Sequence, residues 1–181
     1  MKTHYFLWLI IPLAALIACE PTNDTKQGDV DQIDSNVRIL SSDLQPNCWF
    51  NENTLQKEVY HTQPWASKLD STWTDSYGFR SSFSDLGKGI PKSINIGFWG
   101  LFTNPKSDTK LVIGIDSVTT QVFWAGIDLK DSVKEANVWR EFNYTMVVPP
   151  NLRPDDRLTV YVWSFDKQLL YVDDLKISLV Y

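Results

Sequence analysis

Three aromatic residues in the second half of the chain stand where a strand would turn their side chains away from a protein core. Trp124 and Tyr161 lie between apolar neighbours and Trp163 follows Val162, so in an extended strand all three fall on the opposite side from those apolar residues. Flat aromatic rings stack on the apolar C–H faces of sugar rings, while carboxylates and amides hydrogen-bond the hydroxyl groups. Polar residues of this kind share the non-core side. We therefore predict a ligand-binding set, with the two tryptophans as stacking platforms, that consists of Trp124, Trp163, Tyr161, Asp116, Asp128 and Asn143.

The same alternation places Trp99 and Trp139 on the non-core side of their own strands. These tryptophans have a second interpretation, because large aromatic residues are mostly buried in folded proteins. A sheet that is covered on both faces would pack them under loops or under the segment 37–40. Both interpretations stay open from the residues alone.

The chain carries no recognisable catalytic motif. It has no Gly-x-Ser-x-Gly, no His-x-x-x-His and no Gly-rich phosphate loop. Cys48 and His61 lie in one short segment, and such neighbours are seldom the pair that a fold brings together for nucleophilic catalysis. Glycoside cleavage needs two carboxyl groups about 5–9 Å apart. The best such pair is Asp116 with Asp128, and we expect both to be solvated, so we predict that the protein is not an enzyme.

These residues require a framework of β-strands. Apolar residues recur at every second position in runs of β-branched and aromatic types, Pro- and Gly-containing breakers separate the runs, and no window of twelve residues shows a helical stripe. Roughly eight or nine strands in a chain of this length indicate an all-β sandwich or barrel. The predicted strands lie within 94–102, 110–116, 122–129, 138–148, 158–163 and 174–181, with shorter ones at 58–61 and 77–83. Their apolar side predicts a core of Ile96, Phe98, Ile113, Ile115, Phe123, Ile127, Phe142, Val160, Val162, Leu175 and Ile177.

The N-terminus has the pattern of a secretory signal peptide. Lys2 precedes an apolar run over residues 5–18 that contains no acidic residue. The run is short for a helix that spans about 30 Å of hydrocarbon. Its end, Leu16-Ile17-Ala18-Cys19, resembles the lipobox of bacterial lipoproteins. The resemblance implies that residues 1–18 are removed, that the Cys19 sulfur receives a diacylglycerol and that the new amino terminus is acylated, for example with palmitate.

A lipid on Cys19 would anchor the mature chain in a membrane of the bacterial cell envelope, and we expect the outer membrane, on its periplasmic or surface face. Residues 19–44, rich in Asn, Asp, Thr, Ser and Gln, predict a flexible tether, and residues 45–181 the sandwich domain. The segment 37–40 is either an edge strand or the end of the tether. The chain has 22 acidic and 17 basic residues, with no basic run, which argues against nucleic acid as a partner.

Four motifs follow one another in the last third of the chain at a spacing that a known group of folds shares. A tryptophan opens a strand, a proline ends it, an apolar-aromatic strand follows, and a Tyr-Val-Asp-Asp turn leads into the final strand. They are Trp139-Arg140-Glu141-Phe142, Val148-Pro149, Leu158–Trp163 and Leu170–Ile177. The arrangement resembles the C-terminal half of the galactose-binding-like jelly rolls, which include many carbohydrate-binding modules. The resemblance implies a two-sheet jelly-roll sandwich, although a fold by itself does not confer a function.

The same resemblance implies a structural calcium ion. In many of these modules the first aspartate of the final turn and an early glutamate bind calcium together with backbone carbonyls. Asp173 matches that aspartate, and Glu52 stands for that glutamate. Calcium takes about six to eight hard oxygen ligands, which two carboxylates and nearby carbonyls can supply. The alternative is that Asp173 and Asp174 cap a turn and face water, with at most one of them turned inward because neighbours on a strand point to opposite faces.

These observations together predict a membrane-anchored envelope lipoprotein with a non-catalytic, carbohydrate-binding-like module whose partner is a polysaccharide or other glycan. The first alternative is a structural or adhesion lipoprotein whose aromatic face binds protein. A glycan-degrading enzyme is the third class.

Overall fold

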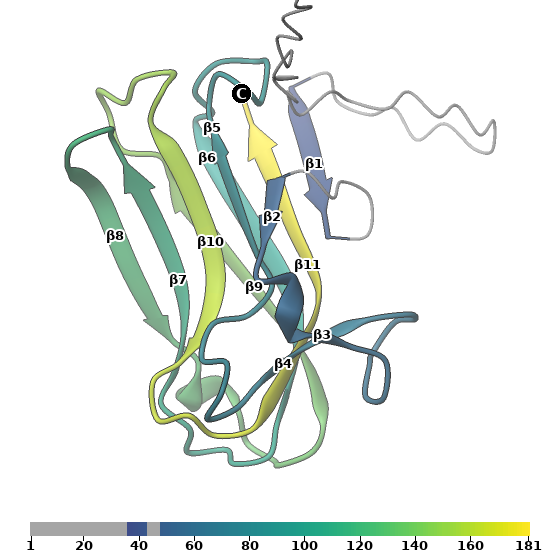
Figure 1. Cartoon of the computed structure of the whole chain (residues 1–181). Helices are drawn as coiled ribbons and strands as arrows, with labels where there is room; N and C mark the ends of the chain where they lie inside the picture. The colour runs from purple at the N-terminus through teal and green to yellow at the C-terminus, as the bar shows by residue number, and fades with distance from the viewer. Residues whose placement is uncertain (1–35, 43–47) are drawn as a thin grey trace, which may run out of the picture.

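A computed structural model describes residues 36–42 and 48–181 of the chain (Figure 1). The predicted signal peptide, Cys19 and most of the predicted tether lie outside the described residues. Within them, no helix is both long enough and apolar enough to cross a membrane.

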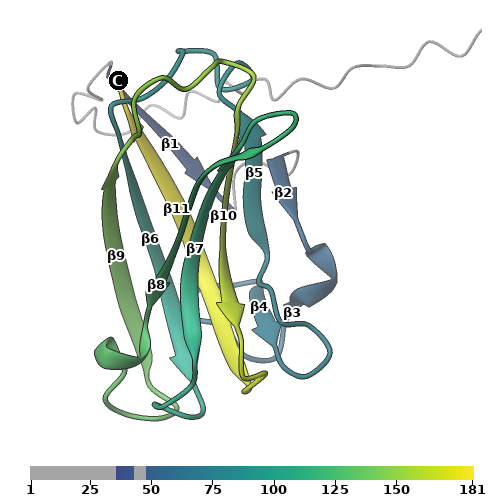
Figure 2. The ribbon, with the colours of Figure 1, turned by 90° about the vertical axis from the view of Figure 1, so that its left-hand side faces the viewer.

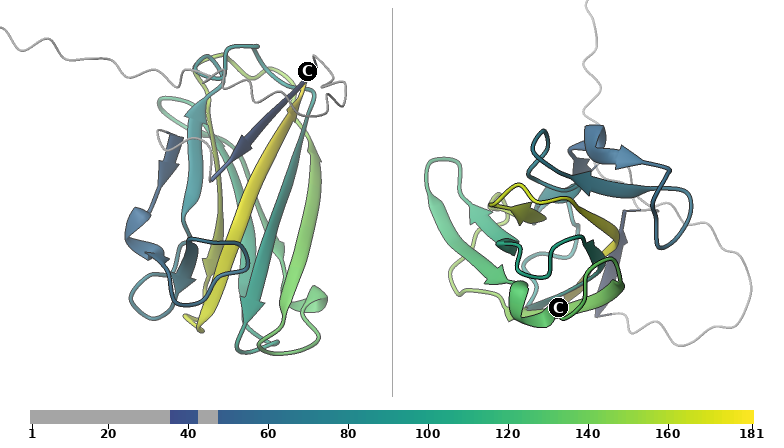
Figure 3. Two further views of the ribbon diagram at one scale, coloured as in Figure 1. Left: turned by 90° about the vertical axis from the view of Figure 1, so that its right-hand side faces the viewer. Right: turned by 90° about the horizontal axis from the view of Figure 1, so that it is seen from below.

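Two antiparallel sheets pack face to face, as the end-on view in Figure 3 shows. Sheet A has the order β3-β4-β11-β6-β9, and β1 pairs with the other end of β11. Sheet B has the order β2-β5-β10-β7-β8. Sheet A consists of β1 (Val37–Ser41), β3 (Leu55–Gln56), β4 (Ala66–Leu69), β6 (Ser93–Phe102), β9 (Trp139–Val147) and β11 (Leu170–Val180). Sheet B consists of β2 (Trp49–Phe50), β5 (Gly78–Ser82), β7 (Thr109–Asp116), β8 (Gln121–Asp128) and β10 (Arg157–Ser164).

From β4 onward the chain changes sheet at each connection except the β7–β8 hairpin, so consecutive strands form the two layers of a jelly roll (Figure 2). This confirms the predicted fold class. Two short 3₁₀ helices, η2 (Glu52–Thr54) and η3 (Lys130–Ser132), lie in connections.

The core lies between the inner faces of the sheets and contains the residues that the alternation predicted. Nine of the eleven predicted core residues are buried, all but Phe123 and Ile127. Those two are half-buried and pack against the core from β8. Since β8 is the edge strand of sheet B, it has a neighbour on one side, and its apolar side chains are covered less completely.

The N-terminal part of the sandwich differs from the sequence prediction in two places. Val37–Ser41 is an edge strand that pairs with β11, which is the first of the two alternatives for residues 37–40, so the sandwich begins within the range 19–44 given to the tether. The segment 58–61 is part of a loop rather than a strand. The Gln56 side chain explains the turn, because its Oε1 atom accepts hydrogen bonds from the backbone N–H groups of Glu58 (2.5 Å) and Val59 (2.9 Å).

The chain enters the sandwich at one end, and two of the residues discussed below lie at the other. The chain enters β1 beside the C-terminus, where the Tyr181 N–H donates to the Asn36 carbonyl oxygen (2.9 Å) (Figure 1). Lys110 and Trp163, near the start of β7 and the end of β10, lie at the opposite end.

Two strand glycines provide a matched test of the packing. A Cβ atom at Gly78 would lie 2.7 Å from Tyr161 Cβ and 2.8 Å from the Val160 carbonyl oxygen, whereas a Cβ at Gly114 would meet no atom within 4 Å. We expect Gly78→Ala to lower the free energy of unfolding by about 1–3 kcal/mol because of this overlap. Gly114→Ala should change it by less than about 0.5 kcal/mol. Urea unfolding followed by tryptophan fluorescence measures both, and equal effects would contradict the strand packing described here.

Candidate functional site

The outer face of sheet B holds five of the six residues that the sequence predicted to bind a ligand. Trp124 and Asp128 lie on β8, Asp116 lies at the end of β7, and Tyr161 and Trp163 lie on β10. Strand β7 runs between the other two strands, so the outward side chains of β8 and β10 lie on either side of β7 on one face.

Trp124 offers an exposed aromatic surface halfway along β8, the edge strand of this face. Its side chain is 48% exposed. A Cβ atom at Gly126 would lie 2.6 Å from Cη2 and 3.2 Å from Cζ2 of Trp124, so the indole ring occupies the space above Gly126. Because the ring extends over its own strand, the sheet covers part of it, and the rest is open to solvent. Any larger residue at position 126 would displace the ring.

A charged pair lies next to this ring. Lys110 is the register partner of Trp163 on one side and of Asp128 on the other, and its Nζ atom forms an ion pair with the Asp128 carboxylate. The hydrogen bond from Lys110 lowers the pKa of Asp128, and the same hydrogen bond raises the pKa of Lys110. Cδ of Lys110 also lies 3.1 Å from the Cβ position of Gly126, which places the lysine stem beside the Trp124 ring. The sequence did not single out Lys110, because its position depends on strand pairing.

Tyr161 and Trp163 are less exposed than Trp124. Tyr161 packs edge-on against Phe50, with ring centroids 5.9 Å apart, and burial raises the pKa of its hydroxyl. Trp163 makes an edge-on contact with Phe165 at 5.2 Å, and Phe165 is 58% exposed. Trp163 and Phe165 therefore continue the aromatic surface to the end of the sandwich, while Tyr161 mainly supports it.

Asp116 lies away from these rings, at the other end of β7. It lines a hollow of about 390 Å³ together with Arg80, Arg157 and Thr159. Its pairing partner is Gln121, whereas Asp128 pairs with Lys110 six residues along β7, which separates the two aspartates by about 20 Å. A glycosidase pair requires about 5–9 Å. The structure therefore excludes the Asp116–Asp128 pair as a catalytic one.

Asn143 belongs to the other sheet. It lies on the outer face of β9 in sheet A, so the thickness of the sandwich separates it from Trp124. Trp99 and Trp139 share that face with Asn143. The predicted non-core side of the strands is thus correct, but it consists of two faces on opposite sides of the molecule.

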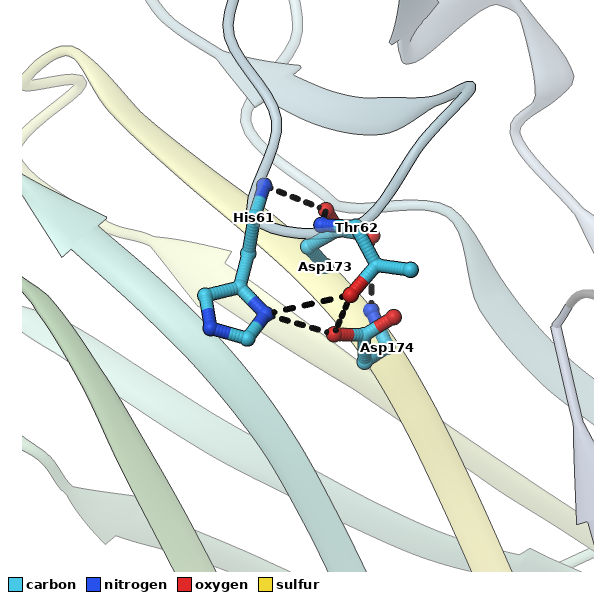
Figure 4. A network of polar contacts seen from close by, with 4 residues as sticks. All are labelled: His61, Thr62, Asp173 and Asp174. Atoms are coloured by element: carbon cyan, nitrogen blue, oxygen red, sulfur yellow. Dashed lines mark hydrogen bonds and ion pairs between the residues drawn. The ribbon is translucent and has the colours of Figure 1, made fainter.

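The loop 57–65, between β3 and β4, covers part of the outer face of sheet A. The His61 ring stacks on the Trp99 indole, with centroids 3.8 Å apart and planes 11° from parallel, and its edge contacts Trp139 at 5.7 Å. His61 Nδ1 lies 2.8 Å from Asp174 Oδ2, which also accepts a hydrogen bond from the Thr62 hydroxyl (2.9 Å) (Figure 4).

Asp173 holds the backbone of the same loop. Its Oδ2 atom accepts hydrogen bonds from the N–H groups of His61 (2.7 Å) and Thr62 (2.9 Å), as Figure 4 shows. Burial raises the pKa of the Asp173 carboxyl, although these donors favour its ionised form. The alternation of a regular strand predicts that Asp173 and Asp174 point to opposite faces, yet both side chains contact the loop 57–65.

A β-bulge in β11 explains this arrangement. Trp99 pairs with Asp173 and Gly97 pairs with Lys176, so two residues of β11, at 174 and 175, stand opposite one residue of β6. The backbone of Asp174 has a positive φ of 52°, which is uncommon for a residue with a side chain. The extra residue turns the Asp174 side chain to the face that Asp173 already occupies.

The residues predicted to bind calcium line one hollow. Glu52, Asp173 and Asp174 line a cavity of about 520 Å³. The two Asp173 oxygens already accept backbone N–H groups, and within residues 36–42 and 48–181 no three His, Cys, Asp or Glu side chains gather closely enough to hold a metal ion. Calcium binding by Asp173 and Glu52 stays a prediction.

Comparisons with known proteins find similar solved structures at low sequence identity. No family model and no curated protein matches the sequence. Among solved structures, the chain is similar to a family 16 carbohydrate-binding module, with 14% identity, a TM-score of 0.45 and coverage of 71% of this chain and 89% of that chain. It is also similar to the CBM22-2 xylan-binding domain from Paenibacillus barcinonensis Xyn10C, with 15% identity, a TM-score of 0.42 and coverage of 74% and 92%.

A third similar structure is the enzymatically active domain of bacteriophage CBA120 tailspike protein 4, with 11% identity and a TM-score of 0.48. The similarity covers 81% of this chain and 20% of that one. At these identities all three similarities concern the β-sandwich fold alone.

We expect Asp173→Ala to release the loop 57–65 from sheet A. The variant removes the acceptor of the His61 and Thr62 N–H groups, and the loss of such bonds to a charged group should lower the free energy of unfolding by about 1–3 kcal/mol. Hydrogen exchange of these two amides should accelerate. Asp155→Ala, at an exposed acidic residue, serves as the control. Unchanged exchange at both amides would show that other contacts hold the loop.

Proposed function

We propose that this protein is a lipid-anchored, non-catalytic glycan-binding protein of a bacterial cell envelope. The observation that carries the proposal is the Trp124 ring, which lies above Gly126 with part of its surface open to solvent, beside the Lys110–Asp128 ion pair. An apolar ring next to charged hydrogen-bonding groups matches the two chemical characters of a sugar, namely its C–H face and its hydroxyls.

The size of the exposed aromatic surface favours a glycan over a folded protein partner. Trp124 and Phe165 are exposed and Trp163 is half-buried, and the charged Lys110 and Asp128 lie beside these rings in the register. A stable protein interface buries about 800 Å² on each partner around a core that is depleted in charge. A linear glycan requires a narrow strip of rings, which this face supplies.

The position of the strip suits a protein anchored through Cys19. The chain enters the sandwich beside Tyr181, at the end opposite to Trp163 and Lys110. A lipid at Cys19, joined to that end through the predicted flexible tether, would leave the aromatic end free to turn away from the membrane. This orientation would present the strip to polysaccharide outside the membrane plane.

We expect Trp124→Ala and Trp163→Ala each to weaken glycan binding about tenfold or more, because a central stacked ring is the best desolvated part of a binding site. The control is Trp65→Ala, at a tryptophan that is 43% exposed but lies on the loop over sheet A. Affinity electrophoresis in gels that contain xylan, mixed-linkage β-glucan, galactomannan or alginate measures the binding. If no polysaccharide retards the wild type, or if both folded variants bind as tightly as the wild type, the sheet B site is wrong. A structural or adhesion role then becomes the better hypothesis.

Lipidation is tested independently of binding. We expect the wild-type protein to partition into the detergent phase of a Triton X-114 extract and Cys19→Ala to stay in the aqueous phase with its signal peptide misprocessed. Each buried methylene contributes about 0.8 kcal/mol, so several acyl chains hold the protein in a membrane almost permanently. Recovery of wild-type protein in the aqueous phase with residues 1–18 attached would contradict the anchor.

A further inference from the structure

The loop 57–65 is fastened to sheet A by polar contacts and is itself exposed. Every residue from 60 to 65 is exposed to solvent. The loop is held by the two N–H groups on Asp173 and by the contacts of His61 and Thr62 with Asp174. Segments with few buried apolar contacts are the parts of a protein that open most readily.

His61 occupies the position that a stacked ligand ring would take. Its ring lies parallel to the Trp99 indole at 3.8 Å, with the Trp139 ring at its edge. In this arrangement the covered face of Trp99 is unavailable to anything outside the protein. If the loop moved, Trp99 and Trp139 would form an open pair of aromatic rings on the outer face of sheet A.

A polar groove of about 360 Å³ adjoins this pair on the same face. Strands β6, β9 and β11 supply its hydrogen-bonding side chains, and Asp174 lines it while it also contacts the loop. The groove combines amides, carboxylates and one ammonium group, which can hydrogen-bond sugar hydroxyls as donors and acceptors. These side chains are Asn95, Glu141, Asn143, Asp174 and Lys176.

The bulge in β11 points to a function for this face. The left-handed backbone at Asp174 costs free energy that a regular strand would avoid, and such local strain gathers at functional sites. Without the bulge, Asp174 would face the core side of β11, away from both the loop and the groove.

We propose that the outer face of sheet A is a second glycan-binding face, which the loop 57–65 keeps closed by stacking His61 on Trp99. Its ligand class rests on the proposed function, because the stacking and hydrogen-bonding chemistry is the same as on sheet B. Loop opening exposes Trp99, and the sugar ring then takes the place of the imidazole. Asn143, which the sequence assigned to a ligand site, belongs to this second face.

The test uses the full mature chain in a Trp124→Ala background, in which we expect binding by sheet B to be about tenfold or more weaker. His61→Ala removes the ring that covers Trp99, and His61→Phe is the matched control because it leaves a flat ring in place. On gels that contain the same four polysaccharides, we expect His61→Ala to bind at least one of them about fivefold more tightly than His61→Phe. Adding Asn143→Ala should abolish this gain. Thermal unfolding checks that each variant is folded.

The outcomes separate this proposal from the proposed function. If folded His61→Ala and His61→Phe bind every polysaccharide equally, the second face is overturned, whatever Trp124 does in the wild type. If the wild type binds through Trp124 and this equality holds, sheet B alone is the glycan site. If the wild type binds nothing while His61→Ala binds in a manner that depends on Asn143, the sheet B site fails and the second face stands.

Discussion

Two sheets stay together in water when the residues of their inner faces exclude it, and in this sandwich aromatic rings do much of that work in sheet A. The Phe98 and Phe142 rings stack with centroids 4.9 Å apart, and Phe102 packs against Phe142 at 5.7 Å. Gly100, between the two phenylalanines of β6, leaves the space that the rings fill, since a Cβ there would lie 2.7 Å from Phe102. The apolar inner faces leave the outer faces free to carry polar and aromatic side chains that the fold does not require.

The two outer faces use this freedom in different ways. On sheet B strand β7 is covered by its two neighbours, β10 and β8: Val112 lies on the outer side of β7, between Tyr161 and Gly126 in the register, and is 1% exposed. The glycine at position 126 lets the Trp124 ring lie down on the sheet instead of standing up from it. A flat, half-exposed ring is thus a consequence of strand pairing combined with the absence of one side chain.

On sheet A the outer face is covered by a loop whose attachment depends on a single irregularity. An unbroken β11 would present one of its two aspartates to the outer face. With the bulge, Asp173 binds the loop backbone while Asp174 binds the His61 and Thr62 side chains. The loop is held by hydrogen bonds and by the stacking of one exposed ring on Trp99, whereas the sandwich is held by its buried apolar core, so the loop can loosen while the sandwich stays folded.

The sequence by itself determined the long strands from residue 77 onward, the apolar side of each of them and the fold class, because the alternation of side chains is a local property of an extended backbone. It missed the short strands β2, β3 and β4 and placed a strand at 58–61 where the structure has a loop. It also determined that Trp124, Trp163 and Asn143 face away from the core. The tertiary structure alone decided which sheet each strand joins. As a result, Asn143 lies on the opposite side of the sandwich from Trp124, and Lys110 lies between Trp163 and Asp128 in the strand register. Strand pairing depends on contacts between residues far apart in the chain, which periodicity cannot reveal. The bulge at Asp174 could not be predicted for the same reason. A residue is extra in one strand only in relation to the residues of the strand that pairs with it.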